Sequence, residues 1–136
     1  MAAQKHPQTL RRQRSTLATA NTTYADTTGT YGTVAATGAT GGSLFYAIQI
    51  TAKDATVLGG AIRFHESSDA GTTKKYMGVE IPVRAVTPIE GVTAPWSYRG
   101  PIPGGPIELP TANDQIYLTT VLAEAFNVIF IGYDYV

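Results

Sequence analysis

Residues 43–53, SLFYAIQITAK, alternate apolar and polar side chains along most of their length. One side of an extended chain would hold Leu44, Tyr46, Ile48 and Ile50, and the other side Gln49, Thr51 and Lys53. A period of two is typical of a β-strand that turns one face to a core and the other to water. This stretch therefore predicts a half-buried strand.

The same alternation recurs further along the chain, in residues 59–67, 77–86, 92–98, 116–122 and 126–135. With Ile48 and Ile50, we expect the core to contain Ile62, Phe64, Val79, Ile81 and Val128. In GGAIRFHES, Arg63 and His65 alternate with the core residues, which predicts that both face solvent. Pro82 cannot donate a ladder hydrogen bond, so its strand is expected at a sheet edge or at a bulge.

Clusters of Gly, Pro, Asn and Asp separate these runs, and no segment shows convincing helical periodicity. Two further short strands are expected within residues 27–37 and 106–110. Together the runs give about eight strands at intervals of roughly 10–15 residues. This spacing predicts an all-β fold, an antiparallel β-sandwich of jelly-roll type.

The composition narrows the class of protein. The chain has 136 residues, a formal net charge of zero and no cysteine. Disulfides, thiolate chemistry and Cys-ligated zinc are therefore excluded. No apolar run reaches signal-peptide form or the roughly 20 residues of a membrane span. We expect one soluble domain that stays in the compartment where it is made, without a membrane partner.

The N-terminal segment differs from the rest. It carries Lys5, Arg11, Arg12 and Arg14 before the first acid, Asp26, and it has few large apolar side chains. We therefore expect residues 1–26 to form an extended basic, Thr-rich arm and residues 27–136 to form the sandwich. Fully extended, such an arm reaches roughly 85 Å, enough to cross to a neighbouring subunit. A disordered tail remains the alternative.

Catalytic chemistry finds little support. Of the two histidines, His6 lies in the arm and His65 on a predicted solvent face, so neither has a nucleophile and an orienting group beside it. Glu66 and Asp69 lie near His65 and are residue types that can bind a metal ion. Consecutive strand residues point to opposite faces, however, so His65 and Glu66 are poorly placed to bind one ion together. We expect no enzyme, no metal and no cofactor. A pair of carboxylates for glycoside chemistry remains open, because the fold and not the spacing sets their separation.

The arginines of the arm could neutralise phosphates, as in salt-dependent nucleic-acid binding. No aromatic residue lies among them to stack on bases, and the body has no basic stripe. An acidic protein surface is therefore favoured over nucleic acid as the partner of the arm.

Three stretches together resemble a family of small β-rich structural proteins of tailed bacteriophages: residues 17–34, 59–88 and 123–135. The most specific match is in the closing strand. The family has the motif Ala-Glu-x-Phe-Asn-Val there, and residues 123–128 of this chain are AEAFNV. An Ile-Pro-Val strand that runs into Thr-Pro also matches, at residues 81–88. The resemblance spans residues 17–136 but departs from the pattern at residues 25–28 and 97–110.

The resemblance implies a non-enzymatic virion component. The arm favours a capsid decoration (cement) protein on the outer surface of the capsid, made in the host cytoplasm. It would act as a homotrimer and bind the major capsid protein, with the arm as a strap that adds a strand to a neighbour's sheet. The expected partner-binding residues are Lys5, Arg11, Arg12, Arg14, Thr16, Thr22, Thr23 and Tyr24. The alternative is a tail, baseplate or head-fibre protein that binds host glycans through Trp96, Tyr98, Tyr133 and Tyr135.

Overall fold

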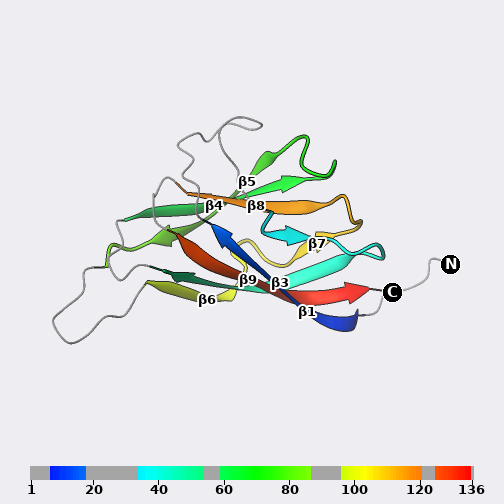
Figure 1. Ribbon diagram of the computed structural model, residues 1–136, viewed down its shortest axis with the longest axis horizontal. Helices are drawn as coiled ribbons and strands as arrows, with labels where there is room; N and C mark the ends of the chain where they lie inside the picture. The colour runs from blue at the N-terminus through cyan, green and yellow to red at the C-terminus, as the bar shows by residue number, and fades with distance from the viewer. Residues whose placement is uncertain (1–6, 18–33, 54–58, 87–95, 121–124, 136) are drawn as a thin grey trace.

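The computed structural model describes residues 7–17, 34–53, 59–86, 96–120 and 125–135. These residues form nine strands and no helix, arranged as two antiparallel sheets packed on each other (Figure 1). The strands are β1 (Pro7–Leu17), β2 (Ala36–Thr37), β3 (Ser43–Ala52), β4 (Gly60–Ser67), β5 (Lys75–Val83), β6 (Ser97–Pro101), β7 (Ile107–Leu109), β8 (Gln115–Thr120) and β9 (Phe126–Tyr135).

The strand order identifies the type of sandwich. One sheet runs β1-β9-β3-β6, with the short β7 also paired to β3, and the other runs β2-β8-β4-β5. The pairs are nested, because β1 pairs with β9, β2 with β8, β3 with β6, and β4 with β5. A long antiparallel hairpin that folds over on itself gives this order, which is that of a jelly roll. The predicted fold class is confirmed.

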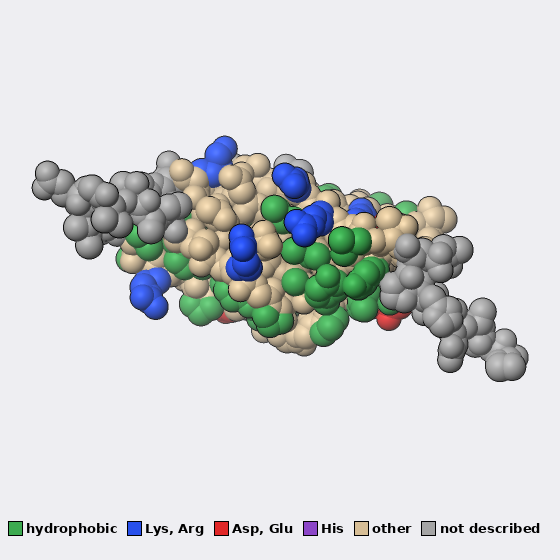
Figure 2. Space-filling model, turned by 90° about the horizontal axis from the view of Figure 1, so that it is seen from below, with side chains coloured by type: hydrophobic (Ala, Val, Ile, Leu, Met, Phe, Trp, Pro, Cys, Tyr) green, Lys and Arg blue, Asp and Glu red, His purple; other side chains and the backbone are tan. Residues whose placement is uncertain are grey.

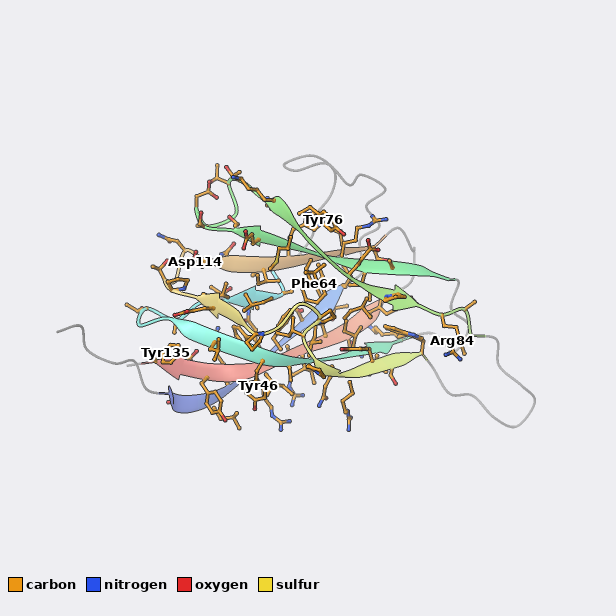
Figure 3. All side chains as sticks on the ribbon, turned by 180° about the vertical axis from the view of Figure 1, so that it is seen from behind. Tyr46, Phe64, Tyr76, Arg84, Asp114 and Tyr135 are labelled. Carbon is orange, nitrogen blue, oxygen red and sulfur yellow. The ribbon has the colours of Figure 1, made fainter. Side chains whose placement is uncertain are left out.

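Phenylalanine side chains join the two sheets at the centre. Phe130 of β9 lies edge-on to Phe45 of β3, with 5.7 Å between ring centroids, and edge-on to Phe64 of β4 at 6.2 Å. All three are fully buried, and Figure 3 shows Phe64 between the sheets. Of the seven predicted core residues six are buried, and Val79 is half-buried against the same core.

A bulge in β3 changes which residues face the core. The pairing with β9 shifts register between Phe45 and Ala47, so one residue of β3 has no counterpart. Phe45 is buried with Ile48, whereas Leu44 and Tyr46 are half-exposed on the opposite side. The prediction that Leu44 and Tyr46 share the core face with Ile48 is wrong.

The second correction concerns β4. Arg63 and His65 are buried, not solvent-facing, because β4 lies inside its sheet between β8 and β5 and both of its faces are covered. The Nε2 atom of His65 lies 2.9 Å from Thr119 Oγ1, and the imidazole packs 5.5 Å from the Tyr76 ring. His65 is part of the packing between strands.

The third difference concerns the predicted arm. Residues 7–17 are not separate from the body but form β1, paired with β9 from Pro7↔Tyr135 to Leu17↔Phe126. The strand alternates, with Leu17 buried and Arg12 and Arg14 exposed. The sandwich therefore begins within residues 1–26, and the predicted boundary at residue 27 does not separate an arm from the strands. Lys5, Thr22, Thr23 and Tyr24 lie outside the described residues.

Candidate partner-binding face

The five-stranded sheet has one side against the other sheet and one side turned outward, which we call the outer face. The register places four pairs from β1 and β9 there: Leu10 with Tyr133, Arg12 with Ile131, Arg14 with Ile129, and Thr16 with Asn127. β3 continues the face with Leu44, Tyr46, Gln49 and Thr51, and β6 with Ser97 and Arg99. Figure 3 shows Tyr46 on this side of the sheet.

The centre of the outer face is apolar. It consists of Ile129 and Tyr133 of β9 and Leu44 of β3, which are half-exposed, together with Leu10 of the edge strand β1, which is 56 % exposed and lies opposite Tyr133. Figure 2 shows hydrophobic side chains gathered on the side of the molecule that it views from below. A sheet face in contact with water normally carries polar side chains at these positions. The outer face therefore has the composition of a surface that another molecule covers.

Arginines border the apolar centre. Arg12 and Arg14 are exposed on β1 and Arg99 is exposed on β6, whereas Glu108 of β7 is the only acidic side chain that the described strands place on this face. No described carboxylate lies within ion-pairing distance of the three arginines. The face is therefore net positive, although the whole chain has no net charge.

Two tyrosines form a pair within the face. The rings of Tyr46 and Tyr133 are 5.4 Å apart and tilted by 30°. Burial raises the pKa of Tyr46, and so does its hydrogen bond with Tyr133, while the positive charge of Arg12 acts in the opposite direction. Arg12, Tyr46 and Tyr133 therefore form one cluster across three strands.

A hollow of about 610 Å³ opens where β1 and β9 reach the Leu17 end of the sheet. It is bordered by the cation of Arg14, the polar side chains of Thr16, Thr51 and Asn127, and the apolar side chain of Ile129. Such a lining offers hydrogen-bond donors and one positive charge to a negatively charged or polar group.

Arg11 belongs to the other side of β1. Its Nη1 donates to Asp134 Oδ1 at 3.1 Å and to Ser43 Oγ at 3.2 Å, and its Nη2 donates to Gln13 Oε1 at 3.0 Å. Ser43 Oγ also donates to Asp134 Oδ1 at 2.6 Å, and the backbone N–H of Thr37 donates to Gln13. This polar network links β1 to β9, β3 and β2, and Arg11 lies on the side of β1 away from the outer face.

The structure thus places the predicted site residues of β1 on two different sides of the strand. Arg12, Arg14 and Thr16 lie together on the outer face, and Arg11 lies behind it. The sequence-based prediction of the binding residues did not include the apolar part of the outer face. A signal existed, since FNVIFIGYDY in β9 is apolar at both alternating sets of positions, which is typical of a strand covered on both sides.

The aromatic residues of the glycan alternative do not form one surface. Trp96 is half-buried and packs edge-on against Phe126 at 5.9 Å. The Tyr98 hydroxyl donates to the carbonyl oxygen of Pro101, three residues further along the chain, at 2.6 Å. Of these residues, Tyr133 lies in the apolar centre of the outer face.

A second hollow, of about 210 Å³, has residues of both sheets in its lining, which includes Glu66, Lys75, Glu108 and Asp114. Within the described ranges, no three His, Cys, Asp or Glu side chains are placed so that they could hold a metal ion. No helix among the described residues is long and apolar enough to span a membrane.

The comparisons with known proteins add no assignment: no family model, no curated protein and no solved structure matches this chain.

Proposed function

We propose that this chain is a non-enzymatic virion structural protein, and specifically a capsid decoration protein of a tailed bacteriophage. The observation that carries the proposal is the outer face, where exposed Leu10 and half-exposed apolar side chains lie among arginines that have no carboxylate partner among the described residues. A protein that works by covering another protein needs such a face and needs no active site. The resemblance of residues 17–136 to phage structural proteins supplies the virion context.

The proposed partner is the major capsid protein. The outer face would lie on the exterior of the shell across neighbouring capsid subunits, with its apolar centre against their surface and its arginines near their carboxylates. Because β1 is part of the sandwich, clamping would depend on this face and not on a free strap of residues 7–17. Copies would assemble as a homotrimer, which matches the local three-fold positions of an icosahedral shell.

Electron cryo-microscopy of the virus particle tests the proposal. Purified full-length protein is added to heads that lack it, and the decorated heads are reconstructed beside undecorated ones. We expect added density on the outside of the head, between capsid subunits, with the five-stranded sheet toward the shell. Heads that bind no protein, or density confined to the inside of the shell, would reject it.

The alternative is a tail, baseplate or head-fibre component that binds host glycans. The Tyr46–Tyr133 pair on the outer face favours it, because sugars stack on exposed aromatic rings. Immunogold labelling of intact particles separates the two locations. A glycan array with full-length protein and the Tyr133→Ala variant then tests sugar binding, which should disappear in the variant if the alternative holds.

A further inference from the structure

The outer edge of β1 is open among the described strands. β1 pairs with β9 on one side over its length, and it is the end strand of its sheet. At 11 residues it is longer than most strands. In an antiparallel pair every second residue directs its N–H and C=O away from the partner strand, so β1 presents a row of these groups at the sheet edge.

Arg12 and Arg14 of β1 have no acidic cross-strand neighbour on β9, the strand with which β1 is paired. Across the ladder, β9 offers Ile131 opposite Arg12 and Ile129 opposite Arg14. Oppositely charged side chains are favourable cross-strand neighbours, and β9 provides none on this face. By contrast, Arg11 on the inner side has Asp134 at 3.1 Å. Since the described residues place no carboxylate beside Arg12 and Arg14, the carboxylates of a partner would reach them from beyond the open edge or from above the face.

The spacing of the two arginines specifies the arrangement of the missing carboxylates. Arg12 and Arg14 are two residues apart on one side of β1, which separates their Cα atoms by about 6.6–6.8 Å. Carboxylates at alternating positions of an extended chain have the same separation and also share one side. Past Arg14, the hollow bordered by Thr16 and Asn127 can receive a further polar side chain.

From these observations we propose that the open edge of β1 binds an extended acidic segment of a partner protein as an added strand. Two carboxylates of the segment, two residues apart, would pair with Arg12 and Arg14. The backbone of the segment would complete the ladder of β1, which is the known mode of strand addition to a sheet edge. The inference rests on the proposed function only for the choice of a protein as the partner.

A simpler role for these arginines is to protect a long edge strand from pairing at all. The two roles differ in one respect that can be measured. Protective charges repel or ignore every added strand, whereas a binding edge discriminates between segments by the charge and spacing of their side chains.

The test uses full-length protein and synthetic strand-forming peptides with blocked ends. The acidic peptide has Glu at two alternating positions. One control has Gln at both, and a second has the same composition with the two Glu adjacent, on opposite faces. Isothermal titration calorimetry at physiological salt measures affinity, and amide hydrogen exchange followed by NMR locates the bound strand. We expect roughly tenfold tighter binding of the acidic peptide than of either control, from two exposed ion pairs, with added protection of β1 amides.

Variants of the protein then test the pairing. Arg12→Glu together with Arg14→Glu should remove binding of the acidic peptide and create binding of a matched peptide with Lys in place of Glu. Arg84→Glu, which follows β5 in the other sheet, is the control and should change little. The side chain of Arg84 is exposed, as Figure 3 shows.

Three results would overturn the inference: equal binding of the peptide with adjacent Glu, no added protection in β1, or an unaltered affinity of the double variant. Tight binding of duplex DNA that the double variant loses, without binding of the acidic peptide, would assign the edge to nucleic acid instead. These results do not depend on the virion proposal. If the protein decorates heads but fails these tests, the inference alone fails, and if it passes them but binds no heads, the proposed function alone fails.

Discussion

Gly132 lies where β9 passes close to the backbone of β3. A Cβ at this position would overlap the carbonyl oxygen of Leu44 and the Cα of Phe45, both of them backbone atoms that cannot move aside. The same place carries the register shift of β3, so the glycine allows the strands to approach at the bulge. The bulge in turn directs Tyr46 to the outer face and Phe45 to the core.

Gly132→Ala should therefore destabilise the fold by about 1–3 kcal/mol, the range for forcing extra atoms into a filled site. The measurement is urea unfolding followed by the fluorescence of Trp96. Gly100→Ala on β6 is the matched control, since its Cβ would find only ordinary contact with the Tyr98 hydroxyl at 3.7 Å. Equal unfolding midpoints for the two variants would contradict the close approach.

The Tyr46 cluster gives a prediction for pH. The pKa of Tyr46 is raised above 10.0 by burial and by the hydrogen bond with Tyr133, and lowered in part by Arg12. A tyrosine with a raised folded-state pKa holds its proton more tightly in the folded protein. Its stabilising contribution is thus present below pH 10 and is lost as the pH rises through the folded-state pKa.

NMR titration of ring-labelled tyrosine can follow this group, with Tyr46→Phe for assignment. We expect Tyr133→Phe to lower the pKa of Tyr46, because the hydrogen bond is lost, and Arg12→Gln to raise it further, because the nearby positive charge is removed. Opposite directions in the two variants are the signature of the cluster. The same direction in both would show that the three side chains do not interact as described.

At the level of the strand, β1 explains both the success and the failure of the sequence reasoning. Strands β3 and β4 were predictable because apolar residues repeat every second position, and β9 because its run of β-branched and aromatic residues favours a strand. Pro82 correctly indicated the edge position of β5. The inward residues of β1 include Arg11 and Gln13, which look like solvent-facing residues in a sequence. Asp134, the partner of Arg11, is 123 residues away, and no local pattern reveals that pairing.

The candidate site was predictable to the same partial extent. A run of basic residues pointed to Arg12, Arg14 and Thr16 as a binding set, and these do share the outer face. The sequence could not separate Arg11 from them, because the separation follows from strand alternation once β1 is known to be a strand. Ile129 completes the face only through its register with Arg14, which is a long-range property.

Removal of β1 tests its place in the sandwich. If residues 1–26 were an independent arm, their deletion would leave a folded and soluble body. With β1 paired to β9, deletion of residues 1–17 exposes a ten-residue edge on β9 and removes the buried Leu17 and the Arg11 network. We expect a lower melting temperature and aggregation through the exposed edge, measured by calorimetry and light scattering. Deletion of residues 1–6, which keeps β1, is the control. An equally stable, monomeric 1–17 deletion would contradict the pairing.

For the molecule as a whole, the outer face combines two kinds of contact that respond differently to salt. Ion pairs of exposed arginines are screened within a Debye length of about 8 Å at physiological ionic strength, whereas the burial of aliphatic side chains is not screened. Leu10 is the most exposed large apolar side chain among the described residues, and Arg12 and Arg14 follow it on the same strand. Both kinds of contact can therefore be removed from one strand without touching the core.

Leu10→Ser should leave the free energy of unfolding within about 0.5 kcal/mol of the unchanged protein, because the side chain makes few contacts in the isolated chain. If a partner buries the outer face, the substitution should cost about 1–2 kcal/mol of binding, or roughly 5–30-fold in affinity for heads. That loss should persist at high salt, whereas the loss from Arg12→Gln with Arg14→Gln should shrink as salt rises. Sedimentation of heads with labelled protein at two salt concentrations measures both effects, with Ala112→Ser in the exposed turn between β7 and β8 as the control. A Leu10→Ser protein that decorates heads as tightly as the unchanged chain would show that the apolar centre stays outside the interface.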